Sequence, residues 1–193
     1  MLGRPCYPTN HMEHDDTFGD SLFLGPLGPL IPVEFESTET KSPFLQCSNC
    51  SLPFAEMDPS TCFIEKAMRQ GECIVEVALC SDCLSSGRCD WSEESIEKLE
   101  QHNIENPLSP AGLAQCAGCS DDADIWADDV TYVGIVDPII GLLGPPALIC
   151  TECLQSLEGT LSVETRRQMD EFTESLLPGI GSEDIPSSSL FVL

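Results

Sequence analysis

LQCSNC at 45–50 and ALCSDCLSS at 78–86 set the pattern of this chain, because AQCAGC at 114–119 and LICTECLQS at 148–156 repeat it. Each stretch holds two cysteines with two residues between them. The inner cysteines are separated by 29 residues (51–79) in the first set and by 30 residues (120–149) in the second. Matching motifs at matching intervals indicate a duplicated module.

The four CxxC pairs have the arrangement of metal ligands. A CxxC turn directs two thiolates at one ion, and two such turns complete a tetrahedral four-sulfur site. Soft thiolates select zinc or iron–sulfur over hard cations. We therefore predict two structural zinc sites, with one Zn²⁺ each. Site one takes Cys47, Cys50, Cys80 and Cys83, and site two takes Cys116, Cys119, Cys150 and Cys153.

Three other uses of these cysteines stay open. Disulfide bonds or a redox-active pair are alternatives, as is a single interleaved site that takes ligands from both modules. The interval between the pairs also exceeds the usual spacing of about 15–20 residues in zinc ribbons. A β-hairpin with a longer excursion accounts for the extra length.

The segments between the cysteines predict a small, metal-stabilised α+β fold of two tandem treble-clef or zinc-ribbon-like modules, each with a knuckle, a hairpin and a helix. In module one (44–105), RQGE (69–72) is a turn signal inside a hairpin over 62–80. A helix follows over 90–102, with Asp90 and Glu93 as its capping pair. In module two (113–177), strands are expected at 129–136 and before Cys150, and an amphipathic helix at 162–177.

Three further segments complete the predicted organisation. Residues 1–43 form an arm rich in Pro, Gly and acidic residues, which is either disordered or packed on module one or a partner. Residues 106–112 form a linker, and 178–193 form a C-terminal tail that ends in LFVL. The linker predicts that the modules fold separately, so that Cys80→Ser should unfold module one and leave module two intact.

The stretch ALICTECLQSLEGTL (147–161) resembles the corresponding half of the zinc-binding domain at the front of the ClpX unfoldase, where a helix begins at a similar cysteine pair. The resemblance implies a treble-clef zinc module that dimerises and docks adaptors. The chain departs from that family in its longer gap between cysteine pairs. It also has no GxxxxGK[ST] phosphate-binding motif for an ATPase domain.

Charge limits the classes of partner. The formal net charge is −25, and the 67 residues between Lys98 and Arg166 include no lysine or arginine. Such a surface repels phosphates, which disfavours nucleic acid, although Lys66 and Arg69 lie on the predicted hairpin. The sequence shows neither a secretory signal nor a membrane span, so a cytoplasmic location is expected. Reducing conditions there favour metal ligation over disulfides.

No catalytic arrangement emerges from the sequence. HMEH at 11–14 lies in the arm and lacks the Pro-Cys-x-x-Cys partner of zinc deaminases, and four thiolates close a zinc site to substrate. We expect a non-enzymatic zinc protein that acts as an interaction or adaptor module for a protein partner, with a homodimer left open. One alternative is a zinc-thiolate redox sensor or redox-regulated chaperone. A second is a nucleic-acid-binding zinc ribbon, which the charge disfavours.

Overall fold

The structure, a computed structural model, describes residues 31–107, 109, 112–125, 128–138 and 140–178. Its elements are η1 (Val33–Phe35), η2 (Phe54–Glu56), β1 (Cys62–Arg69), β2 (Glu72–Cys80), α1 (Ser81–Arg88), α2 (Glu93–Glu105), β3 (Asp129–Asp137), β4 (Gly141–Leu142), β5 (Ala147–Cys150), α3 (Thr151–Gly159) and α4 (Val163–Leu176). The HMEH segment, most of the N-terminal arm and residues 179–193 of the C-terminal tail lie outside the described residues.

The elements expected from the sequence are present, with one corrected boundary. β1 and β2 form the predicted hairpin around a turn in which Gln70 and Gly71 both have positive φ. The capping prediction for α2 was wrong. Its N-cap is Ser92, whose side chain accepts a hydrogen bond from the Ser95 N–H. Asp90 lies two residues before that cap, where no helical N–H needs its carboxylate.

The sheet joins the two halves of the chain. β1 pairs antiparallel with β2 and, along its full length, with β3, which also pairs with β4 and β5. β1 and β3 correspond to each other, because each follows the first CxxC pair of its half. β2 and β5 also correspond, because each ends at the first cysteine of the second pair. The order β2-β1-β3-β5 therefore has an approximate twofold axis between β1 and β3. Separate tandem modules are not confirmed, because the backbone hydrogen bonds of β1 and β3 cross the predicted boundary.

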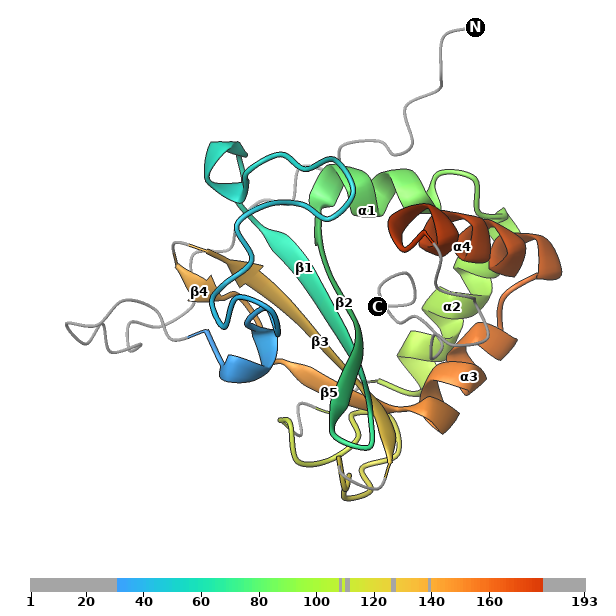
Figure 1. Ribbon diagram of the computed structural model, residues 1–193. Helices are drawn as coiled ribbons and strands as arrows, with labels where there is room; N and C mark the ends of the chain where they lie inside the picture. Colours follow the sequence, from blue (N-terminus) through green and yellow to red (C-terminus); the bar gives the residue numbers. More distant parts are fainter. Residues whose placement is uncertain (1–30, 108, 110–111, 126–127, 139, 179–193) are drawn as a thin grey trace, which may run out of the picture.

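The buried apolar side chains also form one cluster that spans both halves. The cluster includes Leu79 and Leu84 from the first half and Ile149 and Leu154 from the second. The sequence, with few aromatic residues, predicts only small cores. Sharing one sheet lets each half bury its apolar face against the other, so that the common core is larger than either half could form alone. Figure 1 shows the four helices gathered on one side of this sheet.

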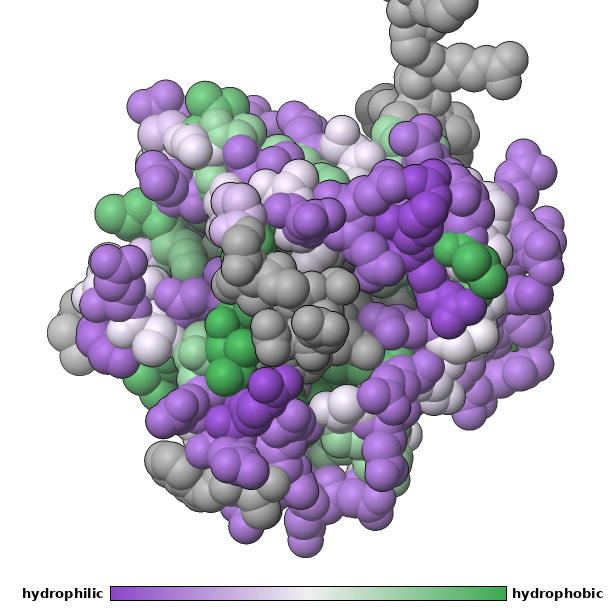
Figure 2. Space-filling model, turned by 45° about the vertical axis from the view of Figure 1, so that its right-hand side comes forward, coloured by the Kyte–Doolittle hydropathy of each residue, from purple (hydrophilic) through white to green (hydrophobic). Residues whose placement is uncertain are grey.

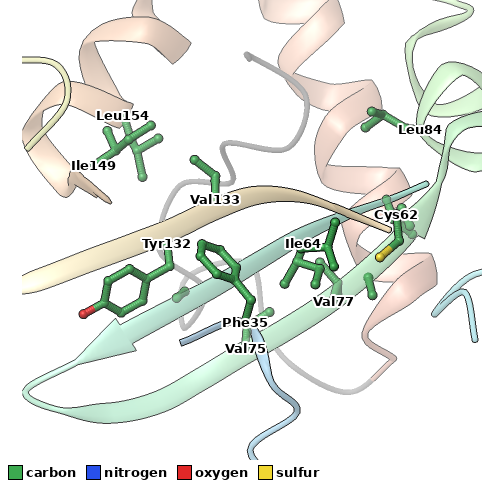
Figure 3. Close-up of a cluster of buried hydrophobic side chains, with 14 of the residues drawn as sticks. Phe35, Cys62, Ile64, Val75, Val77, Leu84, Tyr132, Val133, Ile149 and Leu154 are labelled. Atoms are coloured by element: carbon green, nitrogen blue, oxygen red, sulfur yellow. The ribbon is translucent and has the colours of Figure 1, made fainter. Parts of the chain in front are cut away.

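The described end of the predicted N-terminal arm belongs to this core. The Phe35 side chain is completely buried, and Figure 3 shows it between the side chains of Tyr132 and Ile64. It lies directly over Gly134 of β3, where an added Cβ would meet the ring at 2.7 Å. Lys66 donates to the Glu36 carbonyl at 2.7 Å, and the Thr38 N–H donates to the Glu76 carboxylate at 2.7 Å. Residues 31–43 are therefore part of the folded body.

The twofold relation extends to the starts of the two long helices. Ser92 caps α2 and Ser162 caps α4, and their hydroxyl oxygens lie 3.3 Å apart. The Ser162 N–H donates to Ser95 Oγ at 2.9 Å, and the Ser92 N–H donates to Thr165 Oγ1 at 3.3 Å. Each helix thus supplies a buried hydroxyl that satisfies a backbone donor at the start of the other.

None of the helices in the described part of the chain is both long enough and apolar enough to cross a membrane.

Candidate metal centres

The four cysteines predicted for site one converge at one end of the sheet. Cys47 and Cys50 come from the turn before β1, Cys80 ends β2, and Cys83 lies in the first turn of α1. Their sulfur atoms all lie within 4.8 Å of one another. The Cys80 N–H donates to the Cys47 sulfur at 3.4 Å, and the Cys83 N–H donates to the Cys80 sulfur at 3.4 Å. These donors, together with the positive end of α1, stabilise negative charge on sulfur.

Site two repeats this arrangement at the opposite end of the sheet. Cys116 and Cys119 form its knuckle, Cys150 ends β5, and Cys153 lies in the first turn of α3. The Cys150 N–H donates to the Cys116 sulfur at 3.3 Å, as its counterpart does in site one. The position of each site along β1 follows from the strand register. Cys80 pairs with Cys62 of β1. Cys150 pairs with Val130 of β3, which in turn pairs with Met68 of β1. Cys62 and Met68 are six residues apart on β1, which corresponds to a distance of roughly 20 Å along the strand between the two sites.

The sulfur spacing fits a tetrahedral ion. A four-coordinate Zn²⁺ with Zn–S bonds near 2.3 Å places its sulfurs about 3.8 Å apart. In site two, the Cys150 sulfur lies 3.6 Å from that of Cys116 and 4.0 Å from that of Cys119. Each group of four cysteines can therefore hold one metal ion, and the predicted separation into two sites is the one that the fold brings together. No other such group occurs among the residues that the structure describes.

One thiol in each site has a pKa below its usual value. Burial opposes ionisation of Cys47, but N–H donors of Cys50, Cys80 and Asn49 outweigh it and lower the pKa to about 7. Burial likewise opposes ionisation of Cys116, and donors of Cys150, Cys119 and Gly118 lower its pKa to about 7. Burial and the neighbouring sulfurs raise the pKa of Cys83 and of Cys153. A cluster with one ready thiolate needs a cation before the other thiols can ionise.

The knuckles hold their shape by the same backbone hydrogen bonds. The N–H of Cys47 donates to the Leu52 carbonyl at 3.0 Å, and the N–H of Cys116 donates to the Asp121 carbonyl at 2.9 Å. Ser51 and Ser120, one residue past each knuckle, both have positive φ. These paired features make Leu52 the counterpart of Asp121 and Pro53 the counterpart of Asp122.

Enclosure distinguishes the two sites. In site one only Cys50 is exposed and the other three cysteines are buried. In site two only Cys116 is buried, while Cys150 and Cys153 are half-buried and Cys119 is exposed. A hollow of about 420 Å³ opens at site two, lined by its four cysteines and by the carboxylates of Asp121, Asp122, Asp128, Asp129 and Glu152. The sequence showed these acidic residues but not their position around the cysteines.

Two cysteines of the hairpin lie outside both groups. Cys62 is buried opposite Cys80 in the β1–β2 ladder, and burial together with Asp137 and Cys47 raises its pKa to about 12. Cys73 is half-buried, and burial raises its pKa as well. Their raised pKa values keep both as neutral thiols, and a buried neutral thiol packs as a small apolar residue.

Comparison of the chain with protein-family models, with curated proteins and with solved structures found no match.

Proposed function

We propose that this chain is a non-enzymatic zinc protein whose two ions hold one folded body together, and that it serves as an interaction module for a protein partner. The observation that carries the proposal is the convergence of four sulfurs at each end of the sheet, with N–H donors directed at them. Four thiolates occupy all the positions of a tetrahedral Zn²⁺, which leaves none for a substrate. Such ions stabilise a fold.

The order of elements around each site supports a treble-clef arrangement. In the first half a knuckle precedes the β1–β2 hairpin, and α1 carries the last ligand in its first turn. The resemblance to the ClpX-type zinc-binding domain suggests pairing of such modules and docking of adaptors. In this chain the two halves pair with each other through β1 and β3.

The surface favours a protein over a nucleic acid as partner. The net charge is −25, and the two basic residues of the hairpin are already engaged: Lys66 with Glu76 and Arg69 with Asp129. Hydrophilic side chains cover most of the coloured surface in Figure 2, where the apolar ones stand in small separate groups. We propose a partner with a basic surface, because an acidic surface attracts it and repels phosphates.

Metal analysis tests the zinc proposal. Native mass spectrometry of the full chain should show two zinc ions, and X-ray absorption should show sulfur alone in the first shell, near 2.3 Å. A chain that contains no metal, or an iron–sulfur cluster, would contradict it. For the partner, binding to a basic partner should weaken as salt rises, and no retention on heparin at physiological salt is expected.

A redox sensor is the second candidate, favoured by the exposed Cys50 and Cys119. Its thiols would release zinc on oxidation by peroxide, with two thiols forming a disulfide as peroxide is reduced to water. Fast zinc release at micromolar peroxide, reversed by a thiol reductant, would favour the sensor. Slow release that accompanies unfolding would favour the structural role.

A further inference from the structure

The two candidate metal centres form an internal comparison. Both sites consist of four cysteines, and both lie at the start of a helix. In site one the Cys80 N–H donates to the Cys47 sulfur, and in site two the Cys150 N–H donates to the Cys116 sulfur. Within the sites one donor differs, because the Cys83 N–H donates to the Cys80 sulfur in site one and Cys150 of site two accepts no such bond. The surroundings of the two sites differ in two respects: how deeply the cysteines are buried and how many charged side chains lie near them.

Site two is less enclosed than site one, although its Cys116 is buried. Cys80 and Cys83 of site one are 5% and 8% exposed, whereas their counterparts Cys150 and Cys153 are only half-buried. All four sulfur-bearing residues of site two line the hollow of about 420 Å³. An incoming ion or competing ligand that enters this hollow meets cysteines of site two. At site one only Cys50 is exposed, so an incoming ion or ligand meets one accessible cysteine and three buried ones.

The rim of site two also carries charge that site one lacks at matched positions. Asp121 and Asp122 follow the second knuckle, where Leu52 and Pro53 follow the first. Asp128, Asp129 and Glu152 line the same hollow, and of these Glu152 has an acidic counterpart in site one, Asp82. Arg69 pairs with Asp129, so one cation faces a rim of five carboxylates within the described part of the chain. A concave site lined by one sign of charge concentrates counter-ions and speeds their entry.

We infer that site two is the exchangeable metal site of this chain, which takes up and releases a soft divalent ion through its acidic hollow, while site one retains its ion as a fixed structural centre. The inference rests on the proposed function, because it presupposes that both sites hold metal. The inference gives the two sites different roles: the ion in site one stabilises the fold, and the occupancy of site two follows the concentration of free metal ions.

Replacement of zinc by Cd²⁺ in the full chain measures the exchange directly. Thiolates bind the softer Cd²⁺ preferentially, and native mass spectrometry distinguishes chains with no, one or two cadmium ions. The first Cd²⁺ should enter at least about tenfold faster than the second. In a parallel sample, brief treatment with a chelator followed by alkylation should label Cys116, Cys119, Cys150 and Cys153 before the cysteines of site one.

Charge variants test the role of the rim while all eight cysteines are kept. The double variant D121N/D122N should slow the first Cd²⁺ step about tenfold and leave the second step unchanged. The matched control E97Q/E100Q removes two exposed carboxylates from α2, away from both sites, and should change neither rate. Added salt should slow the first step in the wild-type chain and have less effect in D121N/D122N.

The cadmium-exchange and alkylation results distinguish a failure of the exchangeable site from a failure of the proposed structural zinc function. A chain isolated with two zinc ions that exchange at equal rates, or whose site-one cysteines are alkylated first, overturns the exchangeable site and leaves the structural zinc proposal intact. A D121N/D122N variant that exchanges like wild type overturns the role of the acidic hollow. A chain that never holds two ions overturns the proposed function itself.

Discussion

A single glycine leaves room for a ligand at the second knuckle. A Cβ on Gly118 would lie 2.8 Å from the Cys153 sulfur, closer than such atoms approach in proteins. The first knuckle has Asn49 at this position, so the two knuckles are not interchangeable in detail. At the scale of one residue, the geometry of site two therefore depends on the absence of a side chain.

Gly118→Ala tests this dependence. The added methyl group should push Cys153 away from its metal and lower the stability of the zinc-bound chain by about 1–3 kcal/mol. Cadmium exchange and thermal unfolding would both record the change. Gly159→Ala is the matched control, because nothing lies within 4 Å of a Cβ placed there. Equal behaviour of the two variants would contradict the steric argument.

Cys62 is an apolar core residue that happens to lie beside a metal site. It faces Cys80 across the hairpin, and the corresponding neighbour of Cys150 is Val130, buried to the same degree. Cys62→Val should therefore keep two metal ions and change the free energy of unfolding by less than about 1.5 kcal/mol. Loss of one zinc ion in native mass spectrometry would instead make Cys62 a ligand.

At the scale of elements, the segment 31–43 is attached to the sheet through one aromatic side chain. Gly134 leaves the space that Phe35 fills, since a Cβ there would overlap the ring. Phe35 is completely buried, so the ring has no solvent into which it could move. The contact between this segment and β3 thus depends on a matched large and small residue.

Gly134→Ala should lower the free energy of unfolding by about 1–3 kcal/mol through overpacking. Phe35→Leu should also destabilise the chain, because it leaves a cavity. The double variant should be more stable than the sum of the two effects predicts, since the smaller side chain makes room for the methyl group. Strict additivity in denaturant unfolding would show that the two residues do not meet.

The helices α2 and α4 depend on each other for their starts. Ser95 and Thr165 are completely buried, and each accepts the backbone N–H of the cap residue of the opposite helix. Removing one hydroxyl leaves a buried donor without its partner, which is costlier than the loss of a solvent-exposed bond.

Thr165→Val and Ser95→Ala should each lower stability by about 1–3 kcal/mol. Their effects should be coupled, because the four hydroxyl groups form one network. Ser156→Ala on the exposed side of α3 is the control and should stay within about 0.5 kcal/mol of wild type. A double-mutant cycle from chemical denaturation measures the coupling. Its absence would mean that the two helix starts act separately.

The whole molecule is held together by the β1–β3 ladder. Every residue of β1 has a partner on β3, and the apolar core is continuous across the two halves. The two cysteine groups lie at opposite ends of one sheet, so that metal ions bound there would stabilise the same folded unit. The prediction from the linker, that the modules fold separately, therefore gives way to a different expectation from the structure.

Cys80→Ser should destabilise both halves together. The loss of the site-one ion weakens the end of β2, and because β1 lies between β2 and β3, the second half loses its partner as the first half unfolds. Circular dichroism and zinc release should report one transition at a lower denaturant concentration than in wild type. A first transition that releases one ion and leaves residues 113–177 folded would favour separate modules.

Particular residues explain how far the sequence could be interpreted. The hairpin was predictable because RQGE interrupts two strand-like runs, and the ligands were predictable because CxxC spacing is itself a local geometry. The start of α2 was misplaced because Asp90 and Ser92 are both good caps, and only the path of the chain selects between them. The rim around site two was not predictable, since Asp121, Asp129 and Glu152 come from separate segments.

The sequence by itself determined the two groups of four cysteines and most helices and strands, because these depend largely on local motifs and on patterns of residues close together in the chain. Only the tertiary structure decided that β1 pairs with β3, that Phe35 packs over Gly134, and that one cysteine group has three buried members while the other lines an acidic hollow. The physical reason is that strand periodicity specifies which face of a strand is buried but not which strand lies beside it.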